Sequence, residues 1–214
     1  MCSSDLRYDE ATWFRLGDLD LATHLYRTRR LAEGAALSTV TSEVTRAWDL
    51  AVRLIPMTDD RVRTRITVAA TDGTDAELAM QEWFVRERCA PPVRSVRFEG
   101  AETARPAPGV LEALRTATTI VICPSNPVIS VGPILAVPGI RDVLRERRDR
   151  VVAVSPIVSG APVKGPADRL MAPLGIDVSC VGVAATYAEI CGTLVIDAAD
   201  GDRAAEVEAL GVRA

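Results

Sequence analysis

The chain has 214 residues, 48% of them hydrophobic, and a formal net charge of -4. This length suffices for one large domain with its own core, and the slightly acidic balance argues against a nucleic-acid-binding surface, which requires clustered basic residues. No apolar run reaches the roughly 18 residues of a membrane-spanning helix, and the first residues lack the basic and apolar regions of a secretory signal. We therefore expect a globular protein with no membrane segment.

The cysteine and histidine counts restrict metal and redox chemistry. The five cysteines include no CxxC pair, which argues against a disulfide framework or a zinc ribbon. The single histidine, His24, excludes a metal site built from several histidines of this chain. Reduced thiols in the cytoplasm are the simplest interpretation.

The first part of the chain predicts a helical subdomain over residues 13–60. Residues 1–12 form a polar lead without periodicity, which we treat as unrelated or disordered. Residues 20–33 carry apolar side chains at helical spacing, and Gly34 follows them as helix-ending glycines do. Residues 37–50 repeat the pattern, with Ser38 as a candidate N-cap.

Residues 61–214 predict an α/β core, so that the chain forms a single domain. Strand patterns occur first at 64–70, 80–88 and 94–99, and a short helix follows at 109–115. From residue 118 onward, strands alternate with helices, the strands at 118–123, 151–155, 178–181 and 193–197 and the helices near 139–148, 166–174, 184–191 and 203–210. Apolar strands alternating with helices are typical of a parallel sheet covered on both faces. Ligands of such sheets bind beyond the carboxyl ends of the strands.

The loop after the 118–123 strand carries Ser125, Asn126 and Ser130 among prolines. The prolines stiffen the loop and present its amide and hydroxyl groups. Asn126 is therefore a candidate for reading a base or carbonyl edge, and the two serines are candidates for binding phosphate or sugar. The alternative is a turn whose polar side chains are satisfied within the protein.

The loop after the 151–155 strand contains Ser159, Gly160, Lys164 and Gly165 and leads into a helix near residue 166. Free amides at a helix start attract anions, and Lys164 adds a positive charge, so this loop is a candidate phosphate-binding segment. It is not a P-loop, because the GxxxxGK[ST] spacing is absent. The alternative is an ordinary strand-to-helix connection with a solvated lysine.

Two further polar groups lie within the first 60 residues. Asp20, His24 and Arg27 are spaced to share one helix face and suit an anionic or hydrogen-bonding ligand. The alternative there is a capping aspartate beside a half-buried histidine. Asp59 and Asp60 are adjacent carboxylates that suit a divalent cation, although such pairs are more often part of a polar turn.

Taken together, these segments resemble the 2-phospho-L-lactate transferase family of coenzyme F-420 biosynthesis. The resemblance rests on WFRLGDLDLATH at 13–24, RT at 27–28, MTDDRV at 57–62, PSNPVIS at 124–130, PIL at 133–135, PGIR at 138–141, SPIVSG at 155–160 and KGP at 164–166. It extends over about residues 13–200, and its specificity comes from the number and order of these motifs.

This resemblance implies a Rossmann-like α/β fold with a helical subdomain, commonly as a homodimer. It implies a transferase that moves a phospholactyl or phosphoenolpyruvyl group from a GDP-activated donor to the deazaflavin Fo, releases GMP and requires Mg2+. The matching motifs would place Ser125 and Asn126 at the guanosine, with Ser130 in the same loop, and His24 and Arg27 at the deazaflavin or phosphate side. They would place Ser159, Gly160, Lys164 and Gly165 near phosphates, while Asp59 or Asp60 supports the metal or holds loops.

The sequence departs from the family pattern at both ends. Family members begin with a strand and a GGxGG loop, followed by acidic segments for the metal and Fo, and none of these occurs here. This departure predicts a member truncated at both ends, whose main metal site lies outside the chain and whose next strand begins near 211–214. A chain truncated in this way would fold poorly and be inactive. The alternative is a nucleotide(-sugar)-binding regulatory protein of the same superfamily, similar to gluconeogenesis factors. A Rossmann oxidoreductase is a third class, but its GxGxxG signature is absent.

Overall fold

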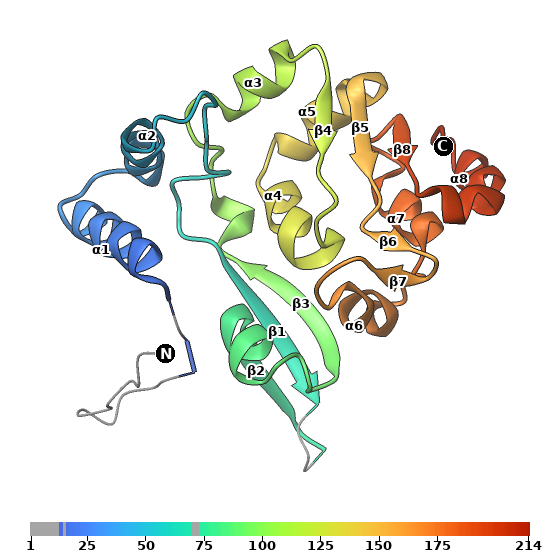
Figure 1. Ribbon diagram of the computed structural model, residues 1–214, viewed down its shortest axis with the longest axis horizontal. Helices are drawn as coiled ribbons and strands as arrows, with labels where there is room; N and C mark the ends of the chain where they lie inside the picture. The colour runs from blue at the N-terminus through green and yellow to red at the C-terminus, as the bar shows by residue number, and fades with distance from the viewer. Residues whose placement is uncertain (1–12, 15, 70–72) are drawn as a thin grey trace.

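The computed structural model describes residues 13–14, 16–69 and 73–214, so the lead at 1–12 lies outside the described residues. Figure 1 shows an arm of two helices, an antiparallel sheet and an α/β unit around a parallel sheet. The helices are α1 (Asp18–Ala32), α2 (Leu37–Ala47), α3 (Val110–Thr116), α4 (Gly132–Ala136), α5 (Ile140–Glu146), α6 (Ala167–Met171), α7 (Cys180–Tyr187) and α8 (Ala204–Ala209).

The strands and short helical turns complete the chain order. The strands are β1 (Arg63–Ala69), β2 (Asp75–Ala79), β3 (Val93–Glu99), β4 (Ile120–Ile122), β5 (Val151–Val154), β6 (Ile157–Val158), β7 (Ala161–Pro162) and β8 (Thr193–Val195). The short turns are η1 (Glu82–Arg86), η2 (Ala101–Thr103), η3 (Pro127–Val131), η4 (Arg148–Arg150), η5 (Ala172–Leu174) and η6 (Ala198–Arg203).

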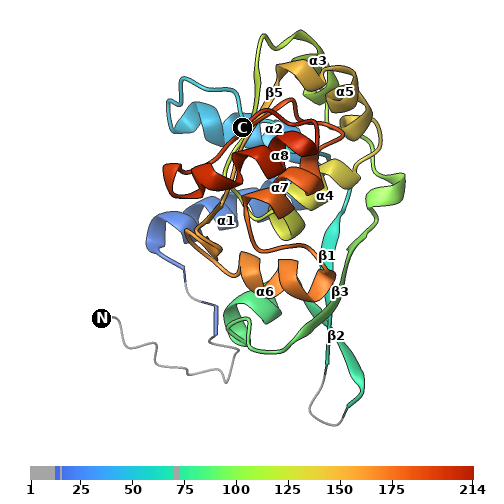
Figure 2. The same ribbon diagram turned by 90° about the vertical axis from the view of Figure 1, so that its right-hand side faces the viewer.

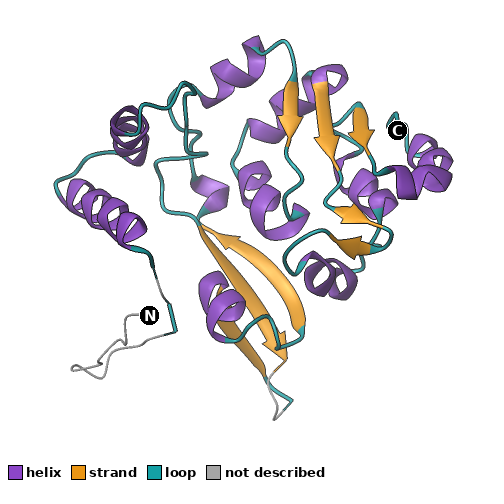
Figure 3. Cartoon of the chain, viewed as in Figure 1, coloured by secondary structure: helices purple, strands orange, loops and turns teal. Residues whose placement is uncertain are grey.

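The parallel sheet has the strand order β4-β5-β8 and lies at the centre of the α/β unit (Figure 3). Ile120 pairs with Val151, and Ala153 pairs with Leu194. These four side chains point to one face of the sheet, and all are buried in the largest core cluster. The predicted α/β fold with a parallel sheet is thereby confirmed.

The opposite face of this sheet is only partly covered. Val121 of β4 and Val195 of β8 are 57% and 47% exposed there, while Val152 and Val154 of β5 are half-buried. Within the described chain β4 is also an edge strand, since it pairs with β5 alone. Strands of parallel sheets are normally apolar on both faces because both are buried, so the exposed part of Val121 is an apolar surface that the described chain leaves open.

The last residues of the chain pair with β8 on its other side. Thr193 bridges to Arg213 in parallel orientation. The backbone N–H of Leu194 donates to the carbonyl of Arg213 over 2.8 Å, and the N–H of Arg213 donates to that of Gly192 over 3.1 Å. Val212 is buried. The residues around Arg213 therefore extend the parallel pairing beyond β8.

The antiparallel sheet has the order β2-β1-β3 and extends away from the parallel unit (Figure 2). The expected strand at 80–88 is wrong, because this segment turns into η1 instead. The indole of Trp83 is fully buried in a cluster with Ile66 and Val68 of β1, and its N–H donates to the Pro91 carbonyl over 3.0 Å. Burial of Trp83 on the sheet face thus outweighs the strand preference of its aromatic neighbourhood.

The expected strand at 178–181 is also wrong, because α7 begins there. The Ser179 hydroxyl accepts a hydrogen bond from the Gly182 N–H over 3.2 Å, which is the usual N-cap contact. Gly182 lies against the Asp177 backbone so closely that an added Cβ would stand 1.9 Å from the Asp177 carbonyl oxygen. The cap and the glycine together start a helix where the apolar run alone indicates a strand.

The arm consists of α1 and α2, which correspond to the two predicted helices. Arg30 donates to both oxygens of the Glu43 carboxylate over 3.0 and 2.8 Å, and the Tyr26 hydroxyl donates to the same group over 2.9 Å. These bonds, those of Arg30 first, lower the pKa of Glu43 to about 2. Helix α1 has no buried residue, and Leu19 and Leu25 are largely exposed. Polar contacts therefore make a large part of the joint between the two helices.

The length and apolar character of the helices bear on whether the chain could cross a membrane. Within the described residues no single helix combines the length and the apolar character needed to cross a bilayer. The segments Pro127–Ala136 and Ile140–Glu146 meet both criteria only when counted together, and they are bent by 94°.

Candidate functional site

A cavity of about 370 Å³ lies beyond the carboxyl ends of β5 and β8, where ligands of parallel sheets bind. Val154 and Val195, the last residues of these strands, line it together with Pro124 and Lys164. Lys164 is exposed and makes no hydrogen bond or ion pair with any residue that the structure describes. Asp197 also lines the cavity, but its carboxylate accepts from the Ala199 N–H over 2.9 Å. This strand-end crevice is therefore mostly apolar, with one unpaired positive charge.

Ser159 and Gly160 form the turn between β6 and β7, with φ angles of 49° and 76°. The Ser159 N–H donates to both carboxylate oxygens of Asp200, over 3.0 and 3.1 Å, and Asp200 is 5% exposed. The Ser159 N–H is therefore already bonded to the Asp200 carboxylate and is not free to bind a phosphate. Gly165, directly after Lys164, has a φ of 78°, a conformation that favours glycine.

Asn126 caps η3 with its side-chain carbonyl. That oxygen accepts from the N–H groups of Val128 and Ile129 over 2.9 and 3.1 Å, while the side-chain NH2 is buried and has no hydrogen-bond partner in the described part of the chain. Ser125 and Ser130 line a different cavity, of about 360 Å³, which runs along β4 between apolar walls. The three residues therefore do not converge on the strand-end crevice, although Ser125 directly follows Pro124 there.

His24 and Arg27 contact one another on α1. Arg27 Nη2 lies 3.0 Å from His24 Nδ1. Because a guanidinium is always protonated, Arg27 donates, and a neutral His24 ring carries its proton on Nε2. Figure 1 shows α1, whose first turn also holds Asp20, well apart from β7 and α6, between which Lys164 lies. The structure thus joins His24 to Arg27 but not to the strand-end crevice.

Asp59 and Asp60 both hold the backbone. The Asp59 carboxylate accepts from the Ser38 N–H over 2.6 Å and from its hydroxyl over 2.8 Å, which ties the start of α2 to this loop. Asp60 accepts from the Arg105 N–H over 2.8 Å. Across the described residues no group of three or more metal-ligating side chains gathers at one point. These contacts match the loop-holding interpretation of the two aspartates.

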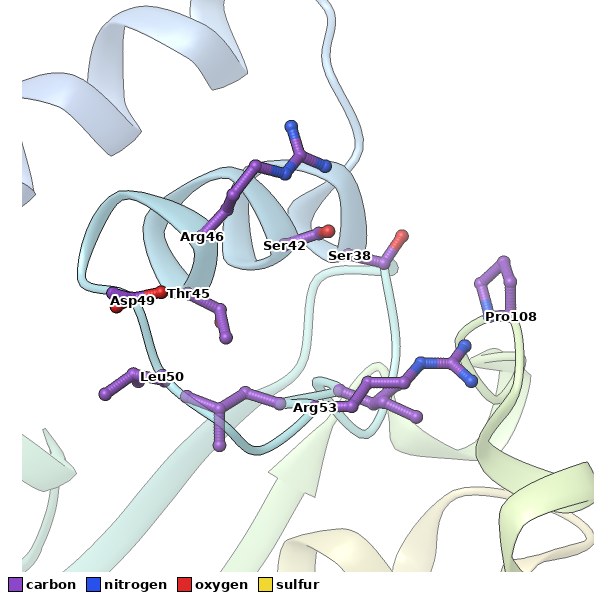
Figure 4. Close-up of a pocket in the computed structure, with 10 residues that line it drawn as sticks. Ser38, Ser42, Thr45, Arg46, Asp49, Leu50, Arg53 and Pro108 are labelled. Atoms are coloured by element: carbon purple, nitrogen blue, oxygen red, sulfur yellow. The ribbon is translucent and has the colours of Figure 1, made fainter.

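A further cavity, of about 350 Å³, lies between α2 and the chain that returns from it (Figure 4). Its lining includes Ser38, Ser42 and Arg46 of α2, together with Asp49 and Arg53. None of the motifs described above predicts this cavity. The available signal is the spacing of Ser38, Ser42 and Arg46, which are four residues apart and so share one helix face.

Known proteins resemble this chain along most of its length. Residues 5–209 match the family model described as 2-phospho-L-lactate transferase CofD. A phosphoenolpyruvate transferase of Streptomyces griseus is 46% identical over 202 residues, covering 94% of this chain and 63% of the relative. A protein of the same name from Mycobacterium tuberculosis is 42% identical over 205 residues, covering 94% of this chain and 62% of its own length.

The fold has a solved counterpart. The crystal structure of a UPF0052 family member from Bacillus halodurans has a TM-score of 0.58 and 19% identity, covering 94% of this chain and 66% of that protein. At this identity the likeness shows the fold alone. The chain spans about 63% of the length of the curated relatives that it matches.

Proposed function

Because the chain belongs to the 2-phospho-L-lactate transferase CofD family, we propose that it acts as a transferase in coenzyme F-420 biosynthesis. It moves a phosphoenolpyruvyl or phospholactyl group from a GDP-activated donor to the deazaflavin Fo and releases GMP. The name of the curated relatives, phosphoenolpyruvate transferase, favours the enolpyruvyl form. The structural observation that carries the proposal is the strand-end crevice with the unpaired Lys164.

The proposed reaction is a substitution at phosphorus. A ribityl hydroxyl of Fo forms a new P–O bond, the P–O bond to the GMP portion breaks, and the hydroxyl proton is released to solvent. Such a step depends on positioning and charge neutralisation more than on a covalent nucleophile. In this proposal Lys164 neutralises donor phosphate charge, and the apolar walls of the crevice exclude water.

Magnesium, a homodimer and a cytoplasmic location belong to the proposal as well. The residues described here do not fit a complete magnesium site, since they hold no cluster of three ligands and Asp59 and Asp60 are bonded to backbone. We therefore assign no step to the metal. The described cysteines, Cys89, Cys123, Cys180 and Cys191, are free thiols, which agrees with a reducing compartment.

A footprint on Lys164 tests the proposal. Lys164 is the only lysine of this sequence, so amine acetylation followed by peptide mass spectrometry reports on it directly, with an added lysine-containing peptide as the internal reference. We expect GDP to slow acetylation of Lys164 and UDP to have little effect. Equal protection by UDP favours the regulatory nucleotide-binding alternative. Unchanged acetylation with every nucleotide contradicts a phosphate site at Lys164.

A further inference from the structure

We propose that the cavity beside α2 is a second ligand site, which binds a small organic anion carrying a phosphate or carboxylate group. We call it the arginine pocket and define it by Ser38, Ser42, Arg46, Arg53 and Leu54. None of these residues lines the strand-end crevice. The proposal therefore stands independently of the proposed transferase function.

The pocket has two walls, and the guanidinium of Arg53 lies at one end of it. Helix α2 forms one wall and the returning chain from Asp49 to Ile55 forms the other, while Arg53 reaches toward Pro108 (Figure 4). An ideal Cβ on Gly109 would lie 2.5 Å from Arg53 Nη2. The glycine thus leaves the space that the Arg53 guanidinium occupies.

The α2 wall is fixed to the rest of the protein. Ser38 donates to the Asp59 carboxylate through both its N–H and its hydroxyl. Val40 is 1% exposed, and the Thr45 hydroxyl, which is part of the pocket lining, donates to the Thr41 carbonyl over 2.7 Å. Because these contacts hold the helix, its pocket-facing side chains start from fixed backbone positions.

The charge of the pocket favours an anion. Neither Arg46 nor Arg53 makes a hydrogen bond or ion pair with another residue in the described ranges, although Arg46 is close enough to Glu43 to lower the pKa of that carboxylate. The lining contains the two arginines and one acidic residue, Asp49, so positive charge is in excess there. Each guanidinium offers five N–H donors in a planar fork that matches phosphate and carboxylate oxygens.

The remaining lining and the size point to a small organic molecule. Leu50, Leu54, Ile55 and Pro108 supply apolar contact beside the polar groups. The volume of about 350 Å³ is at the lower end of the range of small-molecule sites. A ligand with one anionic group and a short apolar body fits both properties.

Phenyl phosphate is the probe that we would use, with benzoate and phenol as its carboxylate and neutral counterparts. Titration followed by amide chemical shifts locates the binding. We expect phenyl phosphate to shift the amides of Ser38, Ser42 and Thr45, whereas a shift of the Lys164 amide would report binding at the strand-end crevice instead. Tighter binding of phenyl phosphate than of benzoate assigns the pocket to phosphate esters, and the reverse order assigns it to carboxylates; either order supports an anion site.

Matched variants test the role of the arginines. We expect Arg53→Ala to weaken phenyl phosphate binding by about tenfold, the scale of one charge-assisted hydrogen bond, and Arg53→Lys to retain part of the affinity. Arg94→Ala is the control, since Arg94 is exposed on β3 and has no partner among the described residues. Circular dichroism melting verifies that each variant is folded. Equal affinities of the Arg53→Ala and Arg94→Ala variants, or phenol binding as tightly as phenyl phosphate, would overturn the proposal.

Discussion

At the scale of single residues, a polar side chain can bind a ligand only where its hydrogen-bonding groups are not already used within the protein. Asp59 and Asp60 hold the backbone at Ser38 and Arg105, and the carbonyl of Asn126 caps η3. Lys164 and Arg53 line cavities without a partner in the described chain. The same reasoning identifies Glu43 as a structural residue, since its carboxylate accepts from both Arg30 and Tyr26.

We predict that Glu43→Gln loosens α1 from α2. An amide cannot accept the paired charge-assisted hydrogen bonds that a carboxylate accepts from a guanidinium. Trypsin should therefore cleave after Arg27 and Arg29 faster in the variant than in the parent chain. Glu146→Gln is the control, because Glu146 is exposed and makes no contact of this kind with a described residue. Equal cleavage rates in both variants would show that the carboxylate does not hold the arm.

The pH dependence of this joint has a definite sign. The pKa of Glu43 is lowered from 4.5 to about 2, chiefly by the Arg30 hydrogen bonds. A lowered pKa in the folded state means that the stabilisation is complete above pH 4.5 and is lost as the pH falls through about 2. Amide-exchange protection of α1 should follow this course in the parent chain and be flatter in Glu43→Gln.

At the scale of secondary-structure elements, local patterns predict most of the α/β unit and fail where tertiary contacts decide. The strands β4, β5 and β8 follow from their runs of apolar, mostly β-branched residues, which are typical of parallel strands. The segments at 80–88 and 178–181 are helical instead, since Trp83 must reach the face of β1 and Ser179 caps α7. The first of these contacts joins residues from different elements, and no local periodicity reports it.

We predict that Gly182→Ala destabilises the fold strongly. The new Cβ would stand 1.9 Å from the Asp177 carbonyl oxygen, so the start of α7 or the preceding loop has to move. Overpacking of this kind costs about 1–3 kcal/mol or more, measured as a lower denaturant midpoint. Gly201→Ala is the matched control, because nothing lies within 4 Å of its Cβ position. A Gly182→Ala midpoint equal to that of Gly201→Ala would contradict this packing.

At the scale of the whole molecule, the candidate residues separate into distinct places, which the sequence does not reveal. Lys164 lies at the strand-end crevice, His24 and Arg27 lie on the arm, and Ser125 and Ser130 line the cavity along β4. The sequence shows which motifs are present and in which order. It does not show whether their side chains meet at one site, because that depends on how the arm and the two sheets are placed. The arginine pocket illustrates this limit, since Arg53 follows α2 in a segment without periodicity and Pro108 comes from a distant part of the chain.

The distribution of exposed apolar side chains leads to a prediction about the behaviour of the whole chain in solution. Val121 projects from the partly covered face of β4, next to the strand edge that no other strand of the described chain pairs with. Open apolar edges promote strand pairing between molecules, and a charged residue at the edge opposes it. We therefore expect Val121→Lys to increase the fraction of soluble monomer in light scattering and size-exclusion chromatography.

A matched variant separates the edge effect from a general gain in charge. Leu210 is an exposed leucine that follows α8 and lies outside all the sheets. Leu210→Lys adds the same charge as Val121→Lys and removes an apolar side chain, but it leaves the β4 edge unchanged. If pairing at β4 drives association, Val121→Lys alone suppresses it. Equal effects of the two variants would instead assign association to exposed apolar area in general, to which the leucines of α1 also contribute.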